Sequence, residues 1–587
     1  MPIAHPRKFS FFSVNLLLKS QLEFWFGLSL AFALYYCVLA IGQAFGSEYV
    51  VQDDAREYVF WMQRFLDPEL LPNDLIADYF QSVTPPGYAA LFRLMAGVGV
   101  TPLLLSKLLP VALCLVSTIY CFGFCLQLLP VPMAGFITTV LLNQSLWVKD
   151  DLASATPRAF VYPLLLAFLY YLSRRSLLPC LASLALLGLF YPPLVFVAAG
   201  VLCLSLLRWQ GWRPQLDSNR SNVRFCVLGL GVVLLVLLPY ALGSSRFGPM
   251  ISLAKAKLMP EFAANGRIRF FSDNPWFFWL EGQHSGLRLT FTPALYAASF
   301  LLPILLRYPE RFPLVRQLRP ALVILPQLVL ASVAIFLLAH ATLFKLFLPS
   351  RYTQHSFKIL MAVAAGIALT VLLHALLTWG SRRSEQNFNP KKILAFSLAG
   401  LLGMVLITYP SFLKKFPRTG YVTGHFPELY EFFAQQPKDS LIASLAEEAD
   451  NLPTFAQRSI LVGQEYVLPY HMGYYRQVRQ RTADLLQAQY SSDWAVIRDL
   501  IQTYGVDFWL LDRAAFEPEY ITRKRWLRQL QPETSEALSA LKQGTPVLAQ
   551  PLDRCEAFAT EKWVVLRADC LLNALPVGKS SALAQSP

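Results

Sequence analysis

Two pairs of adjacent aspartates are the residues in this sequence best suited to chemistry. Asp53 and Asp54 occur in "VVQDDAREYVF", just after an apolar run long enough to cross a bilayer, and Asp150 and Asp151 occur in "LWVKDDLASATPRAF". An aspartate pair at the centre of a bilayer would cost about 5–7 kcal/mol on insertion scales, so we expect these residues at the membrane interface or in a wet cavity. A carboxylate held there can act as a catalytic general base.

Cationic and protonatable side chains gather later in the chain, in "HATLFKLFLPSRYTQHSFKIL". An arginine in this stretch can hold a phosphate in a two-point contact. For Lys345 and Lys358, ordinary snorkelling to the membrane interface stays open as an alternative. The candidate catalytic residues are Asp53, Asp54, Asp150 and Asp151, and the candidate substrate-binding residues are Arg158, Lys345, Arg351, Tyr352 and His355.

The composition indicates that a membrane positions these groups. The chain has 587 residues, of which 55% are hydrophobic and only 15% charged, which is far too apolar for a water-soluble protein of this length. The fold class is therefore a polytopic α-helical membrane protein. Runs of this length and apolarity predict about eleven transmembrane helices, near residues 22–44, 103–128, 133–148, 158–173, 177–190, 192–208, 225–243, 290–307, 321–347, 356–378 and 392–410.

The Lys and Arg residues predict the orientation of these helices. The net charge of +14 lies largely in short loops, a distribution typical of cytoplasmic loops and lipid contacts and a poor fit to nucleic-acid binding. We expect a cytoplasmic N-terminus, a transmembrane domain of residues 1–410, and extracytoplasmic loops at 45–102, 149–157, 244–289 and 348–355. Short loops favour a bacterial plasma membrane. The basic residues on the inner side include Arg7, Lys8, Arg174, Arg175, Arg316, Arg319, Arg382 and Arg383.

The C-terminal region has a different pattern. "SLIASL", "RSILVG" and "VDFWLL" are short apolar runs typical of buried strands, while "SDWAVIRDLIQTYG" has helical periodicity, with Ser491 or Ser492 as its cap and Gly505 as its stop. We expect a small extracytoplasmic α/β domain at 411–575 and a disordered tail at 576–587. If this region faces an oxidising compartment, Cys555 and Cys570 should form a disulfide.

Carboxylates and cations on one membrane face fit glycosyl transfer from a lipid phosphate. The hydroxyl or amine acceptor needs a general base, and the departing phosphate needs its developing charge neutralised. The sequence has no P-loop, and its nearest Gly-x-Gly, at Gly229 and Gly231, lies inside an apolar run. Because nucleotide sugars are cytoplasmic, a donor used on the outer face would be carried across on a lipid.

In the order and position of these motifs, the sequence resembles the GT-C class of integral membrane glycosyltransferases. This superfamily depends on polyprenyl-phosphate sugars and includes protein mannosyltransferases and aminoarabinose transferases. The similarity spans nearly the whole chain, with "QDDA" after the first apolar run, "TPPGY" in the same loop, "KDDLASATPR" between the third and fourth runs, and "LPSRY" in a late loop. The chain departs from many relatives in having no His before "PPGY".

The resemblance implies a role for each site residue. Asp53 or Asp54 would be the base, Asp150 or Asp151 would assist the acceptor or a divalent metal, and Arg351, beside Tyr352, would contact the carrier phosphate. The implied partners are a polyprenyl-phosphate sugar donor, membrane lipid, and a glycan, lipid or protein acceptor. A divalent cation is the only cofactor that the resemblance leaves open.

Two other functions stay open. A transporter or flippase usually keeps ionisable groups near the bilayer midplane, where these apolar runs have almost none. A non-catalytic member of the same fold would bind a glycan or serve in assembly, with acidic loops that only solvate the surface. The arrangement of the site separates these cases, because an enzyme should bring the aspartate pairs and Arg351 into one cavity.

Overall fold

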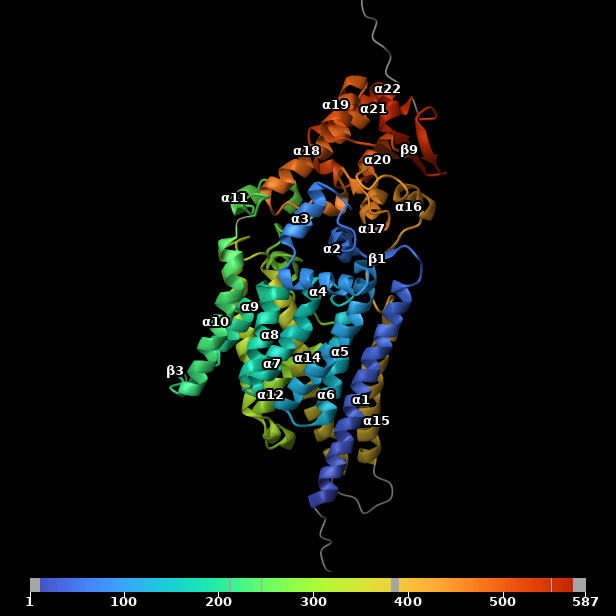
Figure 1. Ribbon diagram of the computed structural model, residues 1–587. Helices are drawn as coiled ribbons and strands as arrows, with labels where there is room; N and C mark the ends of the chain where they lie inside the picture. Colours follow the sequence, from blue (N-terminus) through green and yellow to red (C-terminus); the bar gives the residue numbers. More distant parts are fainter. Residues whose placement is uncertain (1–10, 211–212, 244, 382–389, 551, 574–587) are drawn as a thin grey trace, which may run out of the picture.

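The computed structural model describes residues 11–210, 213–243, 245–381, 390–550 and 552–573. The helices form an upright bundle, and the C-terminal region lies at one end of it, opposite the start of α1 (Figure 1). The predicted tail at 576–587 lies outside the described residues, as do the basic residues Arg7, Lys8, Arg382 and Arg383.

All eleven apolar runs are helical. Within the described ranges, six helices are long and apolar enough to cross a membrane: α1 (Phe11–Ala44), α5 (Pro102–Leu128), α10 (Arg220–Leu242), α13 (Ile324–Ala341), α14 (Ser350–Ser381) and α15 (Pro390–Thr408). The chain is therefore a multi-pass helical membrane protein. The other runs form the shorter helices α6 (Pro132–Trp147), α7 (Val161–Ser173), α8 (Leu177–Phe190), α9 (Pro193–Leu204) and α12 (Leu302–Arg307), so the count of eleven spans stays a prediction.

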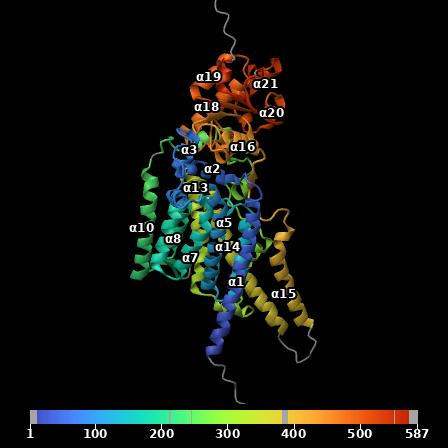
Figure 2. The same ribbon diagram turned by 45° about the vertical axis from the view of Figure 1, so that its right-hand side comes forward.

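The outermost helices present apolar side chains to their surroundings. α10 lies at the edge of the bundle in both views, and α15 stands apart from α1 in the turned view (Figure 2). In their most apolar windows, only 22% of the α10 residues and 11% of the α15 residues are buried inside the protein. A helix that is apolar and yet exposed needs lipid around it.

Small side chains allow α14 to pack closely inside the bundle. α14 contacts α6, α13 and α15, and its buried residues include Ala362, Ala365 and Gly366. A Cβ atom on Gly366 would lie 2.0 Å from the Oγ1 atom of Thr138 on α6, so only glycine fits at this contact. Close approach through small residues is the usual way that helices associate in lipid.

The segment between α1 and α5 folds into a strand and three helices: β1 (Val50–Gln52), α2 (Asp53–Met62), α3 (Leu75–Val83) and α4 (Pro86–Gly97). Strand β1 pairs antiparallel with β4 (Tyr421–Thr423), which follows α15 in the chain. The pairing extends to a hydrogen bond of 3.0 Å from the Asp53 N–H to the Gly420 carbonyl. The start of α2, with both aspartates, is therefore fixed against the C-terminal region.

The C-terminal region contains a five-stranded sheet in the order β6 (Ser459–Ile460), β5 (Leu441–Ala443), β7 (Phe508–Asp512), β9 (Trp563–Arg567) and β8 (Glu556–Ala559). The first three strands are parallel, and β9 and β8 are antiparallel to their neighbours. The three predicted strand runs are β5, β6 and β7. A disulfide joins Cys555 to Cys570 beside the sheet.

Helices surround this sheet. The longest is α18 (Met472–Gln489), and α19 (Trp494–Tyr504) ends at Gly505 as predicted, in a left-handed conformation. Its cap is Asp493, not Ser491 or Ser492, because the Asp493 carboxylate accepts a hydrogen bond from the Ala495 N–H. The remaining helices are α11 (Leu253–Ala256), α16 (Pro427–Ala434), α17 (Leu452–Phe455), α20 (Pro518–Arg523), α21 (Glu533–Gln543) and α22 (Ala568–Asn573), and a separate strand pair is formed by β2 (Leu207–Gln210) and β3 (Arg213–Leu216).

Candidate active site

One aspartate from each pair meets at a single arginine. The Nη2 atom of Arg158 binds the Oδ2 atom of Asp54 and lies 2.5 Å from the Oδ2 atom of Asp150. The side chains of Asp54 and Asp150 are 41% and 37% exposed, so both carboxylates can still reach a substrate. The chain thus joins two acidic segments that are far apart in sequence through one guanidinium.

Local structure positions these three side chains. Gln52, at the end of β1, caps α2 by accepting a hydrogen bond of 2.9 Å from the Ala55 N–H. The Gln52 amide nitrogen is 3.4 Å from the Oδ2 atom of Asp150. Arg158 lies on a short 3₁₀ turn, Pro157–Phe160, that leads into α7. The carboxylates are therefore held by a strand end, a helix start and a tight turn.

Burial raises the pKa of the Asp150 carboxyl above its usual value. The Arg158 charge opposes this rise, and the neighbouring Asp54 carboxylate adds to it. Two carboxylates that share a site disfavour the state in which both are ionised. Asp150 consequently holds a proton more readily than an isolated aspartate, which suits a group that takes part in proton transfer.

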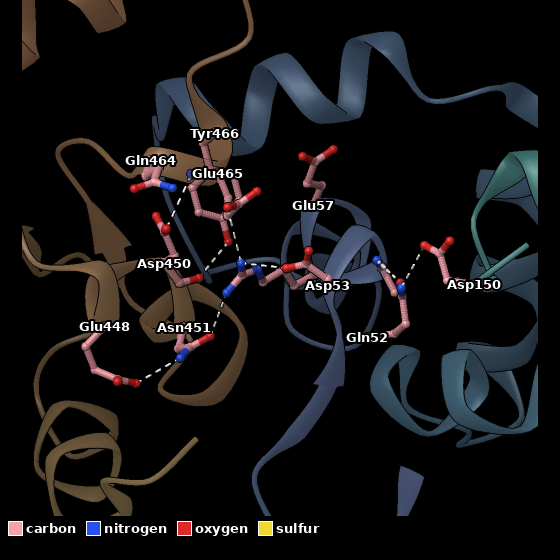
Figure 3. Close-up of polar contacts among 12 residues, drawn as sticks. Gln52, Asp53, Glu57, Asp150, Glu448, Asp450, Asn451, Gln464, Glu465 and Tyr466 are labelled. Atoms are coloured by element: carbon pink, nitrogen blue, oxygen red, sulfur yellow. Dashed lines mark hydrogen bonds and ion pairs between the residues drawn. The ribbon is translucent and has the colours of Figure 1, made fainter. Parts of the chain in front are cut away.

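Asp53 faces away from this pair. Its Oδ1 atom accepts a hydrogen bond of 2.8 Å from Arg56, which also donates to Asn451 of the C-terminal region at 2.9 Å. Figure 3 shows Asp53 between the C-terminal residues on one side and Gln52 and Asp150 on the other. Asp53 therefore helps to join α2 to the C-terminal region.

A charged cluster surrounds this junction. Arg267 lies 3.6 Å from Glu57 on α2 and 3.2 Å from Glu465 in the C-terminal region. Burial raises the pKa of Glu57 to about 8 and that of Asp450 to about 7, although Arg267 and Arg56 oppose these shifts. Both carboxyl groups are thus poised to change charge near neutral pH.

Asp151 is buried and paired. Its carboxylate binds the Lys358 ammonium and accepts a hydrogen bond of 2.8 Å from the Tyr162 hydroxyl. Burial alone would raise the pKa of Asp151, but Lys358 and His355 bring it below its usual range. Its side chain is only 3% exposed and that of Lys358 2%, so Asp151 has no access to a substrate and Lys358 does not snorkel.

The predicted loop 348–355 is mostly helix, because α14 begins at Ser350, directly after Pro349. The polar side chains Arg351, Tyr352 and His355 obscured this start in the hydropathy pattern. His355 is buried, with its Nδ1 atom 2.9 Å from the Tyr162 hydroxyl. The Tyr352 hydroxyl donates to the Leu346 carbonyl and so has a structural contact, and Lys345 is exposed.

Arg351 lies close to the aspartate site. Tyr191 lies in the turn between α8 and α9, where burial raises the pKa of the Tyr191 hydroxyl. The charges of Arg351 and Arg158 both oppose that rise, so both arginines are in electrostatic range of Tyr191. Among the described residues, the Arg351 guanidinium has no hydrogen-bonded or ion-paired partner. The structure therefore brings Asp54, Asp150, Arg158 and Arg351 to one region, and directs Asp53 and Asp151 elsewhere.

A basic pocket that the sequence did not reveal adjoins this region. A cavity of about 380 Å³ is lined by Lys149, Arg269 and Arg288, together with apolar and neutral residues and Glu281. Burial and the neighbouring charges of Lys358 and Arg288 lower the pKa of Lys149 to about 8. Lys149 directly precedes Asp150, so adjacent residues face the basic pocket and the carboxylate pair. This adjacency was the only sequence signal for the pocket.

Two unpartnered nitrogen atoms lie on the loop that carries Arg288 of this pocket. The Nε atom of Arg288 and the Nδ1 atom of His284 are buried without a hydrogen-bond partner among the described residues. Burial and the charges of Arg351 and Arg288 lower the pKa of His284 to about 3, so this side chain is neutral at pH 7. A convergent set of donors with positive charge is well suited to bind an anion such as phosphate.

An apolar groove continues from the basic pocket along the bundle. The groove has a volume of about 570 Å³ and is lined by residues of α12, α13, α14 and the 3₁₀ helix Ala294–Leu301, including Phe300, Val329 and Phe357. Leu289 lines both the groove and the basic pocket. An anionic head group and an apolar chain would therefore occupy adjoining spaces.

The sequence left a divalent cation open as a cofactor. In the described ranges, no group of three or more His, Cys, Asp and Glu side chains could hold a metal ion. The two carboxylates best placed for such a role, Asp54 and Asp150, instead share the Arg158 guanidinium.

Comparison with known proteins identifies the fold. No protein-family model matches the chain, and no curated protein matches its sequence. The oligosaccharyltransferase of Archaeoglobus fulgidus is similar in structure: its apo form has a TM-score of 0.51 at 12% identity, covering 86% of this chain and 72% of that one. The same archaeal protein, AglB, in complex with an inhibitory peptide and a dolichol-phosphate has a TM-score of 0.50 at 11% identity, covering 90% and 72%.

A weaker similarity is to ArnT from Cupriavidus metallidurans bound to undecaprenyl phosphate, with a TM-score of 0.45 at 13% identity over 93% of this chain and 98% of that one. At that TM-score it adds nothing to the comparison of folds. The archaeal structures match over most of this chain. The chain shares the fold of the archaeal oligosaccharyltransferase.

Proposed function

We propose that this chain is a membrane glycosyltransferase that moves a sugar from a polyprenyl-phosphate donor to an extracytoplasmic acceptor. In this proposal residues 1–410 form the transmembrane domain and 411–575 an extracytoplasmic domain. The N-terminus is cytoplasmic and the membrane is a bacterial plasma membrane. The end of the bundle that carries Asp54 and Asp150 then faces outward, together with the C-terminal region.

The observation that carries the proposal is the continuity of three adjoining features. An apolar groove meets a basic pocket at Leu289, and Lys149 of that pocket directly precedes Asp150 of the carboxylate pair. A polyprenyl chain fits the first feature, its phosphate the second, and a sugar held by that phosphate would reach the third. The archaeal AglB, whose fold this chain shares, has been solved with a dolichol-phosphate, which supports a carrier of the same chemistry here.

The proposed reaction is a single displacement. Asp54 accepts the proton of the acceptor hydroxyl, and the oxygen of that hydroxyl forms a bond to the anomeric carbon of the sugar. The bond between this carbon and the phosphate oxygen breaks, and polyprenyl phosphate leaves with the bonding electrons. Asp150 holds the acceptor hydroxyl, while Arg158 keeps both carboxylates in place. Arg351 and Arg288 neutralise the charge that develops on the phosphate.

The test is release of free polyprenyl phosphate from a panel of polyprenyl-phosphate sugars by the purified full-length chain. Asp54→Asn should lower the rate by at least about a hundredfold, which is the lower end of what a general base contributes. Arg288→Ala should raise the KM for the donor, whereas Arg316→Ala should not, because Arg316 is exposed and paired with Glu310 outside the site. Full activity of both Asp54→Asn and Arg288→Ala would refute the proposal.

A further inference from the structure

A second cavity lies between α2 and the C-terminal region, away from the basic pocket. It has a volume of about 610 Å³, and its lining includes Arg56 from α2, Asp450 and Gln464 from the C-terminal loops, Tyr520 from α20 and Trp563 from β9. This volume is within the usual range for pockets that bind small molecules. The cavity differs from the lipid groove in its chemistry, because polar side chains dominate its lining.

Three buried side chains in this lining carry polar atoms without a partner. The Nε atom of Arg56, the Oδ1 atom of Asp450 and the Nε1 atom of Trp563 have no hydrogen-bond partner among the described residues. These residues are only 7%, 3% and 2% exposed. Buried polar groups are nearly always hydrogen-bonded, and each one left alone costs free energy. These three side chains thus line the cavity with two donors and one acceptor whose hydrogen-bonding capacity is unused.

Figure 3 shows how the acceptor is presented. The Asp450 carboxylate points toward Gln464, whose side chain also lines the cavity. The Oδ2 atom of Asp450 already accepts a hydrogen bond of 3.3 Å from the Glu465 N–H, so that oxygen is held in place. Asn451 and Glu448, which are hydrogen-bonded to each other at 2.9 Å, continue the polar lining.

The charge of the lining narrows the class of ligand. Six Asp and Glu side chains face four Lys and Arg side chains, so an anionic ligand is disfavoured. A neutral molecule rich in hydroxyl groups fits better, because each hydroxyl both donates and accepts a hydrogen bond. The carboxylate, amide and guanidinium groups of the lining match the hydroxyl groups at the polar edges of a sugar ring.

The cavity is linked to the proposed base Asp54 through the start of α2. Arg56 lines it and donates to Asp53 at 2.8 Å, and Asp53 directly precedes Asp54 at the start of α2. We infer that this cavity binds a neutral saccharide and presents one of its hydroxyls to Asp54, which makes a saccharide the acceptor. This inference rests on the proposed function for the transfer step. That step forms the bond from the saccharide oxygen to the anomeric carbon, moves its proton to Asp54 and releases polyprenyl phosphate.

Binding can be measured without catalysis. Saturation-transfer NMR on the full-length chain in detergent, with short neutral oligosaccharides of glucose, mannose and galactose, should detect at least one ligand. Trp563→Phe, which replaces the indole and its N–H donor by a smaller ring, and Asp450→Asn should each weaken that binding about tenfold, as the loss of one hydrogen bond to a buried group does. Trp526→Phe is the matched control, because Trp526 also carries a buried, unpartnered Nε1 atom but does not line the cavity.

The outcomes separate this inference from the proposed function. Asp54→Asn should still bind the saccharide, with at most the loss of one hydrogen bond, and should release carrier phosphate at least about a hundredfold more slowly. If the wild-type chain releases carrier phosphate but binds no neutral oligosaccharide, the inference fails and the transferase stands. If the saccharide binds but no donor is ever turned over, the transferase fails. Unchanged binding in both Trp563→Phe and Asp450→Asn, or tighter binding of uronic-acid oligosaccharides or peptides, would also overturn the inference.

Discussion

The buried pair of Asp151 and Lys358 should be essential to the stability of the bundle. Their side chains are 3% and 2% exposed, so neither charge can be solvated if the other is removed. Breaking a buried ion pair by deleting one partner typically costs about 3–5 kcal/mol, because an uncompensated charge is left behind. We therefore expect Lys358→Met to lower the free energy of unfolding by about this amount.

The double variant Asp151→Asn with Lys358→Met should be more stable than Lys358→Met alone, because it removes both charges. Unfolding in mixed detergent micelles measures these free energies, and Lys345→Met is the matched control for stability, since Lys345 is exposed. Lys358→Met should also lower the rate of sugar transfer, because Asp151 helps to fix Lys149 and Asp150. A Lys358→Met protein as stable as the wild type, or a double variant less stable than the single one, would refute this reasoning.

Three further predictions concern the rest of the fold. The raised pKa values of about 8 for Glu57 and about 7 for Asp450 mean that the folded chain binds protons more tightly than the unfolded one, so stability should fall as the pH rises from about 5 to 8. Asp450→Asn and Glu57→Gln should flatten that pH dependence in melting experiments. Stability that rises with pH over this range would contradict the prediction. Cys555→Ser removes a disulfide that spans a sequence separation of 15 residues and should cost about 3 kcal/mol in unfolding of the oxidised protein, whereas no change would argue against the bond. Gly366→Ala forces a Cβ atom against Thr138 and should destabilise the bundle by about 1–3 kcal/mol; an unaffected melting temperature would show that α6 and α14 pack less closely.

Local patterns in the sequence predicted much of the fold. Each predicted apolar run contains a helix, because a lipid environment favours long apolar segments with internal backbone hydrogen bonds. Short apolar runs identified β5, β6 and β7, and Gly505 identified the end of α19. The cap of α19 was wrong by one or two residues because Ser491, Ser492 and Asp493 are all suitable capping residues.

The site depended on contacts that no local pattern encodes. The turn after α6 directs Lys149 to the basic pocket, Asp150 to Arg158 and Asp151 to Lys358, and Ala155 in that turn has a left-handed conformation with φ of 50°. Strand β1 follows α1 and strand β4 follows α15, so their pairing joins two segments that are far apart in the sequence. The sequence therefore proposed both aspartate pairs, but only the fold shows that Asp54 and Asp150 meet at Arg158.

The most direct test of the central claim is a cryo-electron microscopy structure of the full-length chain with undecaprenyl phosphate. The account predicts phosphate density in the pocket of Lys149, Arg269 and Arg288, with the first isoprenoid units in the groove beyond Leu289. Phosphate density at the opposite end of the bundle, or a lipid chain outside that groove with the pocket empty, would contradict it.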